Sequence, residues 1–356
     1  MELDMREGLE TRVVVIGAGI VGASLAYHLA VKGTQVTVVE AGGIACGVTA
    51  TSFAWINASH SGPDPIAALR GAAISEYHRL ETQLPGLNIR WTGALSYNTN
   101  AGERRQALAK QVSRTQILDL EPNLENPPEQ ALYAAEEGAL DAVHVTHTLI
   151  AGARALGAKI LTQTPVLGFK TLNTRVTGVE TASGVIDADI VVLAAGTGTS
   201  KLTDMLGVAL PIQASPSIFI RYTTQPGLVR TLISNAEMEV RQAVDDTLLA
   251  AEDYLDDAVE NHPMAIALRT AKAIRNELHG VVSIEPELAC VGLRPIPADG
   301  IPIIGYLPNV DGAYVCVMHP GVALAAIVGR LASEEIIDGR DDPALGPCRP
   351  DRFFQA

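Results

Sequence analysis

A glycine-rich turn near the N-terminus is the feature that most constrains the fold of this chain. Its glycines follow the pattern G-x-G-x-x-G at Gly17, Gly19 and Gly22. The β-branched run 11–16 before them predicts a buried strand, and the apolar spacing of 20–31 after them predicts a helix. Residues 35–39 predict a second buried strand. This strand–turn–helix–strand order is typical of a Rossmann-type dinucleotide-binding unit.

Each glycine of the turn has a physical role in binding a pyrophosphate. Gly17 permits the tight turn, Gly19 lets the backbone approach the phosphates, and Gly22 lets helix and strand pack closely. The helix that begins at Ile20 and Val21 would present N–H groups and a partial positive charge to the phosphates.

An acidic residue closes the second predicted strand. Glu40, followed by Ala41, stands 18 residues after Gly22. A carboxylate there can accept hydrogen bonds from both ribose hydroxyls and would repel a 2′-phosphate. The alternative is an incidental glycine-rich turn with Glu40 as a solvated charge. The strand and helix on either side of the motif favour the cofactor site.

Length and charge limit the class of protein. The chain has 356 residues, 47% of them hydrophobic and 19% charged, which predicts two folded domains and excludes compositional disorder. A net charge of −14 argues against nucleic acid or anionic membrane partners. No apolar run approaches the ~20 residues that span a bilayer.

Cysteine usage and the N-terminus indicate a cytoplasmic protein. The cysteines Cys46, Cys290, Cys316 and Cys348 are scattered, which argues against a disulfide framework or a zinc site. The first ten residues are acidic and polar, unlike a secretory signal. His144 and His147 form an HxxH pair without a third ligand nearby, so we expect no metal.

Further elements follow from apolar periodicity and from glycine and proline breaks. Helices are expected at 66–84, near 104–111, at 147–156, at 255–278 with a break at Pro263, and at 322–337. Strands are expected at 89–97, 131–135, 159–169, 177–180, 189–193 and 313–317, with antiparallel strands within 217–249.

Three later segments favour FAD over NAD as the dinucleotide. The small-residue loop 43–52 suits a long extended cofactor. The apolar strand within 189–198 leads into a turn at Ala195 and Gly196, and 300–305 leads into a strand and a second helix start at Gly321.

With these segments in place, the chain resembles the D-amino acid oxidase superfamily of flavoproteins, especially its glycine oxidase and sarcosine oxidase branch. The likeness covers most of the chain, and its most specific part is GLRPIPADGIPIIG at 292–305 followed by HPGVAL at 319–324. The resemblance implies an α/β fold in which a Rossmann-type FAD-binding domain is interleaved with a substrate domain built on a mainly antiparallel sheet plus helices. We expect the FAD-binding domain at 1–85, 140–215 and 286–356, and the substrate domain at 86–139 and 216–285.

The resemblance also implies a set of FAD contacts. The helix near Gly321 would direct its positive end at the flavin and stabilise its reduced anionic form. Relatives that attach the flavin use a Cys near 295–296, where this chain has none, so we expect noncovalent FAD. The expected contacts are Gly17, Gly19, Ile20, Val21, Gly22, Glu40, Ala41, Gly47, Thr49, Ser52, Val166, Ala195, Gly196, Arg294, Pro302, Gly321, Val322, Ala323 and Leu324.

Arg294 and His319 are the expected catalytic-site residues. In glycine oxidase-like relatives an Arg matching Arg294 grips the substrate carboxylate; the alternative is an Arg that pairs with Asp299 and shapes the loop. His319 would polarise the substrate or contact the cofactor, or serve as a structural hydrogen-bonded group.

The chain departs from its relatives in the expected substrate pocket. The partner Tyr of relatives is absent near 237–238, and Arg241 is either its replacement or a charge on a strand surface. Cys46 near the cofactor is interpreted as a small packed residue.

The resemblance implies hydride transfer from a carbon next to nitrogen to flavin N5, imine hydrolysis, and reoxidation by dioxygen with H₂O₂ formed. The substrate would be a small amine or amino acid carrying a carboxylate, and one version is an N-carboxymethyl amine that releases glyoxylate and the free amine. Three alternatives stay open at this point: a D-amino acid dehydrogenase with another electron acceptor, a nicotinamide-dependent dehydrogenase, and a flavin-binding subunit without turnover.

Overall fold

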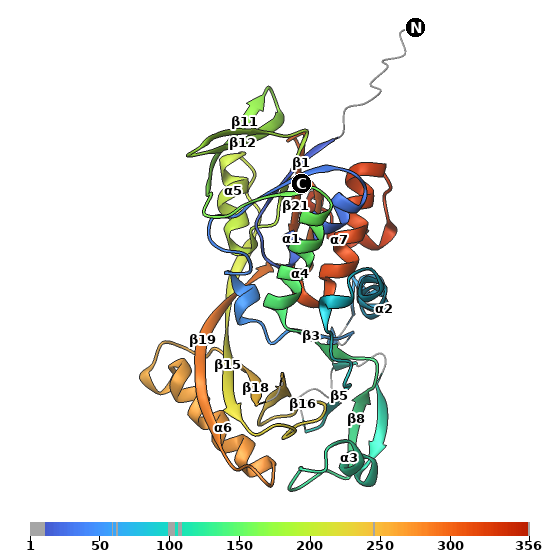
Figure 1. Ribbon diagram of the computed structural model, residues 1–356, viewed down its shortest axis with the longest axis vertical. Coiled ribbons are helices and arrows are strands. Elements are labelled where there is room, and N and C mark those ends of the chain that lie inside the picture. Colours follow the sequence, from blue (N-terminus) through green and yellow to red (C-terminus); the bar gives the residue numbers. More distant parts are fainter. Residues whose placement is uncertain are drawn as a thin grey trace. The chain divides into compact units, whose positions relative to one another are not determined.

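The computed structural model describes residues 11–58, 60–61, 63–98, 104–105, 109–244 and 246–354 (Figure 1). The chain divides into two compact units, each assembled from separated segments. Unit 1 comprises Met1–Gly47, Thr146–Gln213 and Pro295–Ala356, and unit 2 comprises Val48–Val145 and Ala214–Arg294. The expected division differs from these units mainly at 48–85, which belongs to unit 2.

Unit 1 is built on a six-stranded sheet in the order β10-β2-β1-β14-β21-β20. Strands β10, β2, β1, β14 and β21 are parallel, and β20 pairs antiparallel with β21. The strands are β1 (Arg12–Ile16), β2 (Gln35–Val39), β10 (Lys159–Leu161), β14 (Ile190–Leu193), β20 (Ile303–Tyr306) and β21 (Ala313–Val317).

Alternation along the buried strands explains how the layers of unit 1 form. Val14 and Ile16 of β1 pack in a core shared with Val176 and Val179. These two valines belong to a three-stranded antiparallel sheet that consists of β11 (Val166–Leu172), β12 (Arg175–Thr181) and β13 (Gly184–Asp187). Successive side chains of a strand point to opposite faces of the sheet. Val13 and Val15, which are also buried, therefore lie on the face opposite that of Val14 and Ile16.

Helices α1 (Ile20–Val31) and α7 (Gly321–Asp338) lie side by side in unit 1, although they come from opposite ends of the chain (Figure 1). The Ser24 hydroxyl donates to the Ala325 carbonyl over 2.7 Å. The other helices with residues in unit 1 are α5 (Thr199–Met205) and most of α4 (Ala142–Ala155).

Unit 2 is built on an eight-stranded sheet in the order β19-β15-β18-β17-β16-β5-β8-β7. From β15 to β7 the neighbouring strands pair antiparallel, except that β16 pairs parallel with β5. The strands are β5 (Ala94–Ser96), β7 (Lys110–Ser113), β8 (Gln130–Ala134), β15 (Ile212–Thr224), β16 (Leu232–Ser234), β17 (Glu239–Gln242), β18 (Thr247–Asp253) and β19 (Ile284–Pro297).

The two faces of this sheet carry different clusters. On one face, Ile218 and Ile220 of β15 pack in the main core of unit 2 with Ile266 and Ile274 of α6 (Pro263–Glu277). On the other face, Phe219 packs in a smaller cluster whose buried members are Phe53, Ala94, Phe219, Leu232 and Leu249. We call this second side the Phe219 face.

Short elements complete unit 2. They are α2 (Ala67–Gln83), α3 (Arg114–Leu120), β3 (Trp55–Ile56), β4 (His60–Ser61), β6 (Arg104–Arg105) and β9 (Gly138–Ala139). The helix expected near 104–111 is wrong where the structure describes this segment, because β6 and β7 lie there; 106–108 are outside the described residues. The α/β class expected from the sequence is confirmed.

Candidate active site

The turn between β1 and α1 can be built only with glycine at two positions. Gly17 has φ +111°, and a Cβ added to it would lie 2.4 Å from the Ala194 carbonyl oxygen. A Cβ on Gly22 would lie 2.0 Å from the Gly17 carbonyl oxygen. The first turn of α1 is therefore pressed against the turn and against the end of β14. This is the close-approach geometry that a pyrophosphate-binding backbone requires.

Glu40 is held at the mouth of this turn by the backbone. Its Oε2 accepts from the Ala18 N–H at 2.8 Å and its Oε1 from the Gly42 N–H at 2.7 Å. A carboxylate has about four acceptor sites, so about two remain for further donors. The two hydroxyls of a ribose match that number. Cys46 is exposed, not packed as we expected, and its Sγ lies 3.8 Å from Glu40 Oε1.

The N-terminus of α7 lies level with that of α1. A Cβ on Gly321 would lie 3.8 Å from Val21 Cγ2, and one on Gly329 would lie 2.2 Å from Ser24 Oγ. The order of these contacts shows that the two helices run parallel. In the part of the chain that the structure describes, no side chain caps either helix, and neither first turn holds an acidic residue. Two positive helix ends therefore meet at one place, which suits an anionic cofactor.

The other expected cofactor residues of unit 1 are spread around these groups. Ala195 and Gly196 follow β14, and the Ala195 Cα would lie 3.1 Å from a Cβ on Gly17. The Thr164 N–H donates to the Glu40 carbonyl, so the chain passes Glu40 before β11 begins at Val166. Ala41 and Gly47 follow Glu40, Pro302 precedes β20, and Val322, Ala323 and Leu324 form the first turn of α7.

His319 precedes Pro320, the residue before α7, and the peptide bond between them is cis. Gly17, Glu40 and the first turn of α1 fit the ADP part of a dinucleotide. Thr49 and Ser52 lie in unit 2, where Ser52 Oγ accepts from the Ala54 N–H at 3.1 Å.

Arg294 stands near the end of β19 with part of its guanidinium unsatisfied. Its Nη2 donates to Ser215 Oγ at 3.1 Å and to the Pro216 carbonyl at 3.3 Å. Its Nε is buried and has no partner among the residues that the structure describes. Asp299, the alternative partner considered from the sequence, forms an ion pair with Arg352 at 2.7 Å.

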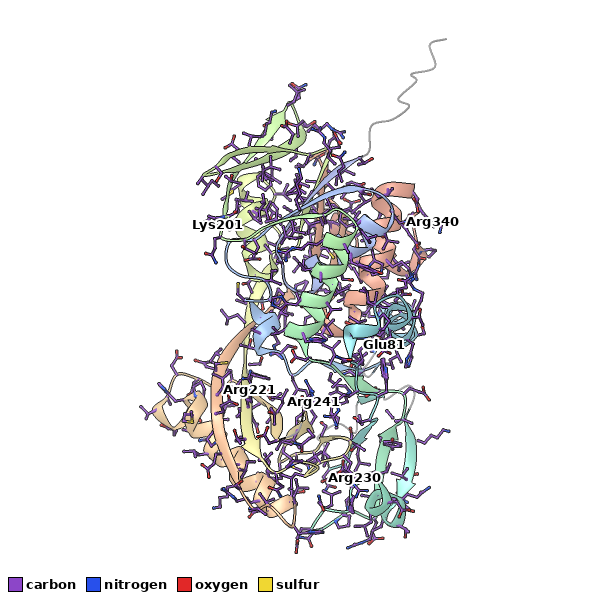
Figure 2. All side chains as sticks on the ribbon, in the orientation of Figure 1. Glu81, Lys201, Arg221, Arg230, Arg241 and Arg340 are labelled. Atoms are coloured by element: carbon purple, nitrogen blue, oxygen red, sulfur yellow. The ribbon has the colours of Figure 1, made fainter. Side chains whose placement is uncertain are left out.

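Arg241 is not the strand-surface charge that we considered. Only 5% of its surface is exposed, its Nε donates to the Phe53 carbonyl at 2.7 Å, and its Nη2 donates to the Leu140 carbonyl at 2.8 Å. Burial lowers the pKa of Arg241 to about 10. Figure 2 labels this residue together with Arg221, which lies two strands away in the same sheet.

Sequence patterns gave no signal for the buried acid Glu137. It accepts from the Trp55 indole N–H at 2.9 Å and from the Ala58 N–H at 3.1 Å, so it fixes the chain that follows Phe53. A lone Glu before a glycine has no motif that would reveal this role.

The described residues contain neither a metal-binding cluster nor a helix that could span a membrane. Across residues 11–354, apart from the gaps given above, no group of three or more His, Cys, Asp or Glu side chains is placed to hold a metal ion. His144 Nε2 instead contacts the Gly86 carbonyl at 2.7 Å. In the same described ranges, no helix combines the length and apolar character needed to cross a bilayer.

Comparison with known proteins places the chain in a family. The model of the DAO family, described as FAD dependent oxidoreductase, matches residues 12–335. Glycine oxidase from Pseudomonas aeruginosa is 27% identical over 364 residues, covering 96% of this chain and 98% of the relative. Glycine oxidase from Bacillus licheniformis is 25% identical over 352 residues, covering 94% of each. The crystal structure of glycine oxidase from Bacillus cereus ATCC 14579 has the same fold, with a TM-score of 0.82 at 21% identity, covering 95% of this chain and 98% of that one. This chain therefore belongs to the DAO family and is an FAD-dependent oxidoreductase.

Proposed function

We propose that this enzyme oxidises the C–H bond next to nitrogen in an amine or amino acid that carries a carboxylate. The observation that carries the proposal is the incompletely satisfied guanidinium of Arg294. A buried Nε–H without a partner is unfavourable, and a carboxylate would satisfy it with a charge-assisted hydrogen bond. The likeness to two glycine oxidases supports an acid as substrate.

The fixed part of Arg294 explains how it would orient a substrate. Ser215 and Pro216 hold Nη2, so the plane of the guanidinium is set before the ligand binds. A guanidinium held in this way offers its Nε–H to a carboxylate in one orientation and leaves the adjacent carbon at a defined place.

The proposal also requires a bound cofactor, which residues of unit 1 would hold. Gly17, Glu40 and the N-terminus of α1 would hold the ADP part of noncovalent FAD. The N-terminus of α7 would face the flavin, with His319 two residues before it. FAD held there would supply the acceptor for the hydride of the substrate carbon, and dioxygen would take up the two electrons and two protons as H₂O₂.

The finer proposal is an N-substituted glycine as substrate. The amine loses a hydride from its carboxymethyl carbon and a proton from nitrogen, which gives an imine. Water adds to the imine carbon, and the C–N bond breaks to release glyoxylate and the free amine. The absence of the Tyr of relatives near Met238 supports a substituent larger than hydrogen on nitrogen.

The test is an assay of purified enzyme with glycine, N-alkyl glycines, D-amino acids and uncarboxylated amines. Each is offered with oxygen and, separately, with an artificial electron acceptor without oxygen. We expect N-alkyl glycines to be used best, with glyoxylate and H₂O₂ as products. If the enzyme were active only with the artificial acceptor, the natural electron acceptor would be a molecule other than dioxygen. If it oxidised only uncarboxylated amines, the proposal would be excluded.

A further inference from the structure

Arg241 is a buried cation without an acidic partner. A guanidinium has five N–H donors, and the bonds to the Phe53 and Leu140 carbonyls use one each on Nε and Nη2. No described residue places a carboxylate within ion-pair distance of it. Asp141 affects its charge from farther away, but this carboxylate accepts from the Val143 and His144 N–H groups at 3.0 Å.

An anion would stabilise this arrangement further. A buried charge is normally compensated by an opposite charge, and carbonyl dipoles compensate it only in part. Arg90, which donates to the Gln242 carbonyl at 3.0 Å, adds a second positive charge near Arg241. With a pKa near 10, Arg241 stays protonated at neutral pH. The surroundings of Arg241 therefore favour an anionic ligand.

Arg241 lies on the Phe219 face of the sheet. In the register of β17 it stands opposite Leu249 of β18 and Leu232 of β16, which are both members of the small cluster on that face. Cross-strand partners point to the same side of a sheet. The aromatic ring of Phe53, from the same cluster, lies 5.5 Å from the Arg241 guanidinium carbon.

Arg294 belongs to the same face by alternation along β19. Leu288 and Cys290 pack on the Phe219 cluster. Gly292 follows two residues later, and a Cβ on it would lie 2.5 Å from Thr51 Oγ1, close in sequence to Phe53. Arg294 comes two residues after that, so this face of the sheet carries Arg294 and Arg241. Arg221 of β15 stands on the same face between their strands, and it pairs with Glu287.

The two guanidiniums cannot chelate one small carboxylate. They belong to β17 and β19, which are three strands apart, and neighbouring strands are roughly 4.8 Å apart. Each is also fixed in place, Arg241 by the Phe53 and Leu140 carbonyls and Arg294 by Ser215 and Pro216. They are placed to bind two separate acidic groups.

We propose that Arg241 binds a second carboxylate of the substrate, so that the enzyme acts on secondary amines with an acid on each substituent of nitrogen. This inference rests on the proposed function, in which Arg294 holds the carboxymethyl group that is oxidised. The second acid extends over the apolar Phe219 face toward Arg241.

The first experiment uses the wild-type holoenzyme and pairs of substrates. N-carboxymethyl derivatives of β-alanine and of 5-aminopentanoate are compared with the same molecules in which the distal acid is a carboxamide. We expect at least one diacid to exceed its amide about 10- to 100-fold in kcat/KM, which corresponds to a hydrogen bond to a charged group. Equal use of every diacid and its amide would overturn the inference and leave the proposed function intact. Failure to oxidise any carboxymethyl amine would overturn both.

The second experiment tests whether the preference for the diacid depends on Arg241 or on a neighbouring arginine. Arg241→Gln removes the charge and keeps an N–H donor, and Arg221→Gln is the matched control. Arg221 stands in the same cross-strand row, opposite Leu249, but has its own acidic partner, Glu287, at 3.5 Å. We expect Arg241→Gln to lower kcat/KM for the diacid about 10- to 100-fold more than for its amide, so that the preference for the diacid is lost, whereas Arg221→Gln leaves that preference in place.

A binding measurement covers the case in which Arg241→Gln does not fold. Thioether diacids, in which sulfur replaces the amine, bind without being oxidised. Wild-type enzyme should bind one of them at least 10-fold more tightly than its monoamide, as measured by the change in the flavin absorption spectrum. Equal affinity for both would show that Arg241 only ties Phe53 and Leu140 to the sheet.

Discussion

Glu40 combines two tasks in one side chain. It accepts from the Ala18 and Gly42 N–H groups, which fixes the backbone on both sides of the expected ribose position. We predict that Glu40→Ala weakens FAD binding by about 1.5–3 kcal/mol, because charge-assisted hydrogen bonds are lost. The measurement is the dissociation constant of FAD, with the rate of flavin reduction in the fraction that retains it. That rate should stay near normal, and an unchanged FAD affinity would remove Glu40 from the site.

Arg294 should act on the substrate and not on the cofactor. We predict that Arg294→Ala leaves FAD bound and lowers kcat/KM for a carboxylated substrate about 30- to 1000-fold, equivalent to the loss of a charge-assisted contact in a partly dry pocket. Steady-state kinetics with an acid and with an uncarboxylated amine measure this effect.

Arg294→Lys is the control for charge without the planar fork. Lysine should restore little of the lost efficiency, since an ammonium cannot reproduce both hydrogen bonds. Full retention of the preference for the acid in Arg294→Ala would assign the anchor to another cation, with Arg241 next in order.

The sequence predicted residues whose roles depend on local motifs and missed those that depend on distant partners. Gly17 and Glu40 lie within one strand–helix–strand unit, so spacing placed them correctly beside each other. Arg241 contacts carbonyls that are 188 and 101 residues away in the sequence, and a strand pattern around a charged residue is ambiguous about its face. The burial of Arg241 could therefore not be predicted from a single sequence.

At the scale of elements, the contact of α1 with α7 depends on glycine. A Cβ on Gly329 would lie 2.2 Å from Ser24 Oγ and 3.0 Å from His28 Nδ1, and both of those groups are buried. We predict that Gly329→Ala destabilises the fold by about 1–3 kcal/mol, the usual range for overpacking. Thermal and denaturant unfolding measure the change.

Gly71→Ala is the matched control for a helical glycine. Gly71 lies within α2, and an added Cβ would meet no atom within 4 Å. This substitution should stabilise the protein by about 0.5–1 kcal/mol through helix propensity alone. If both substitutions shifted stability in the same direction, close packing would not explain Gly329.

Element prediction was best where the period was clear and the ends were marked. The strands 35–39 and 313–317 agree with β2 and β21 residue for residue, and the helix 66–84 agrees with α2 to within one residue at each end. The helix near 104–111 was wrong because a short segment that contains two arginines and a lysine has no apolar period, while pairing with β8 makes Lys110–Ser113 a strand. Long-range pairing of this kind leaves no mark in the local sequence.

At the scale of the whole molecule, the cofactor should behave as a removable part of the fold. We predict that acid precipitation releases a yellow supernatant that contains FAD, since no cysteine stands near 295–296. Precipitated protein that keeps its colour would show a covalent bond elsewhere.

Removal of FAD should also lower stability by mass action. At a free FAD concentration of 100 times its dissociation constant, the holoenzyme should gain about 2.7 kcal/mol over the apoprotein. The measurement is the unfolding midpoint of stripped protein during titration with FAD. A midpoint that does not depend on FAD concentration would contradict a site that exists only in the folded state.

The interleaving of the two units was foreseeable, but the exact division was not. Nucleotide-type segments at 11–40, 189–198 and 313–337 indicated that the cofactor domain would be discontinuous. The residues around Gly47 and Val48 have small side chains and form no motif. They therefore did not indicate that the chain passes from unit 1 to unit 2 there.

The parallel pair α1 and α7 has a consequence for how the protein is made in the cell. Residues 17–40, which hold the turn and Glu40, leave the ribosome early, but α7 begins only at Gly321 and β21 at Ala313. The nascent chain therefore carries half of an anion site during nearly all of its synthesis. Because domains fold as units, the cofactor can be captured only after β21 and α7 have been made, so these late segments decide when that happens.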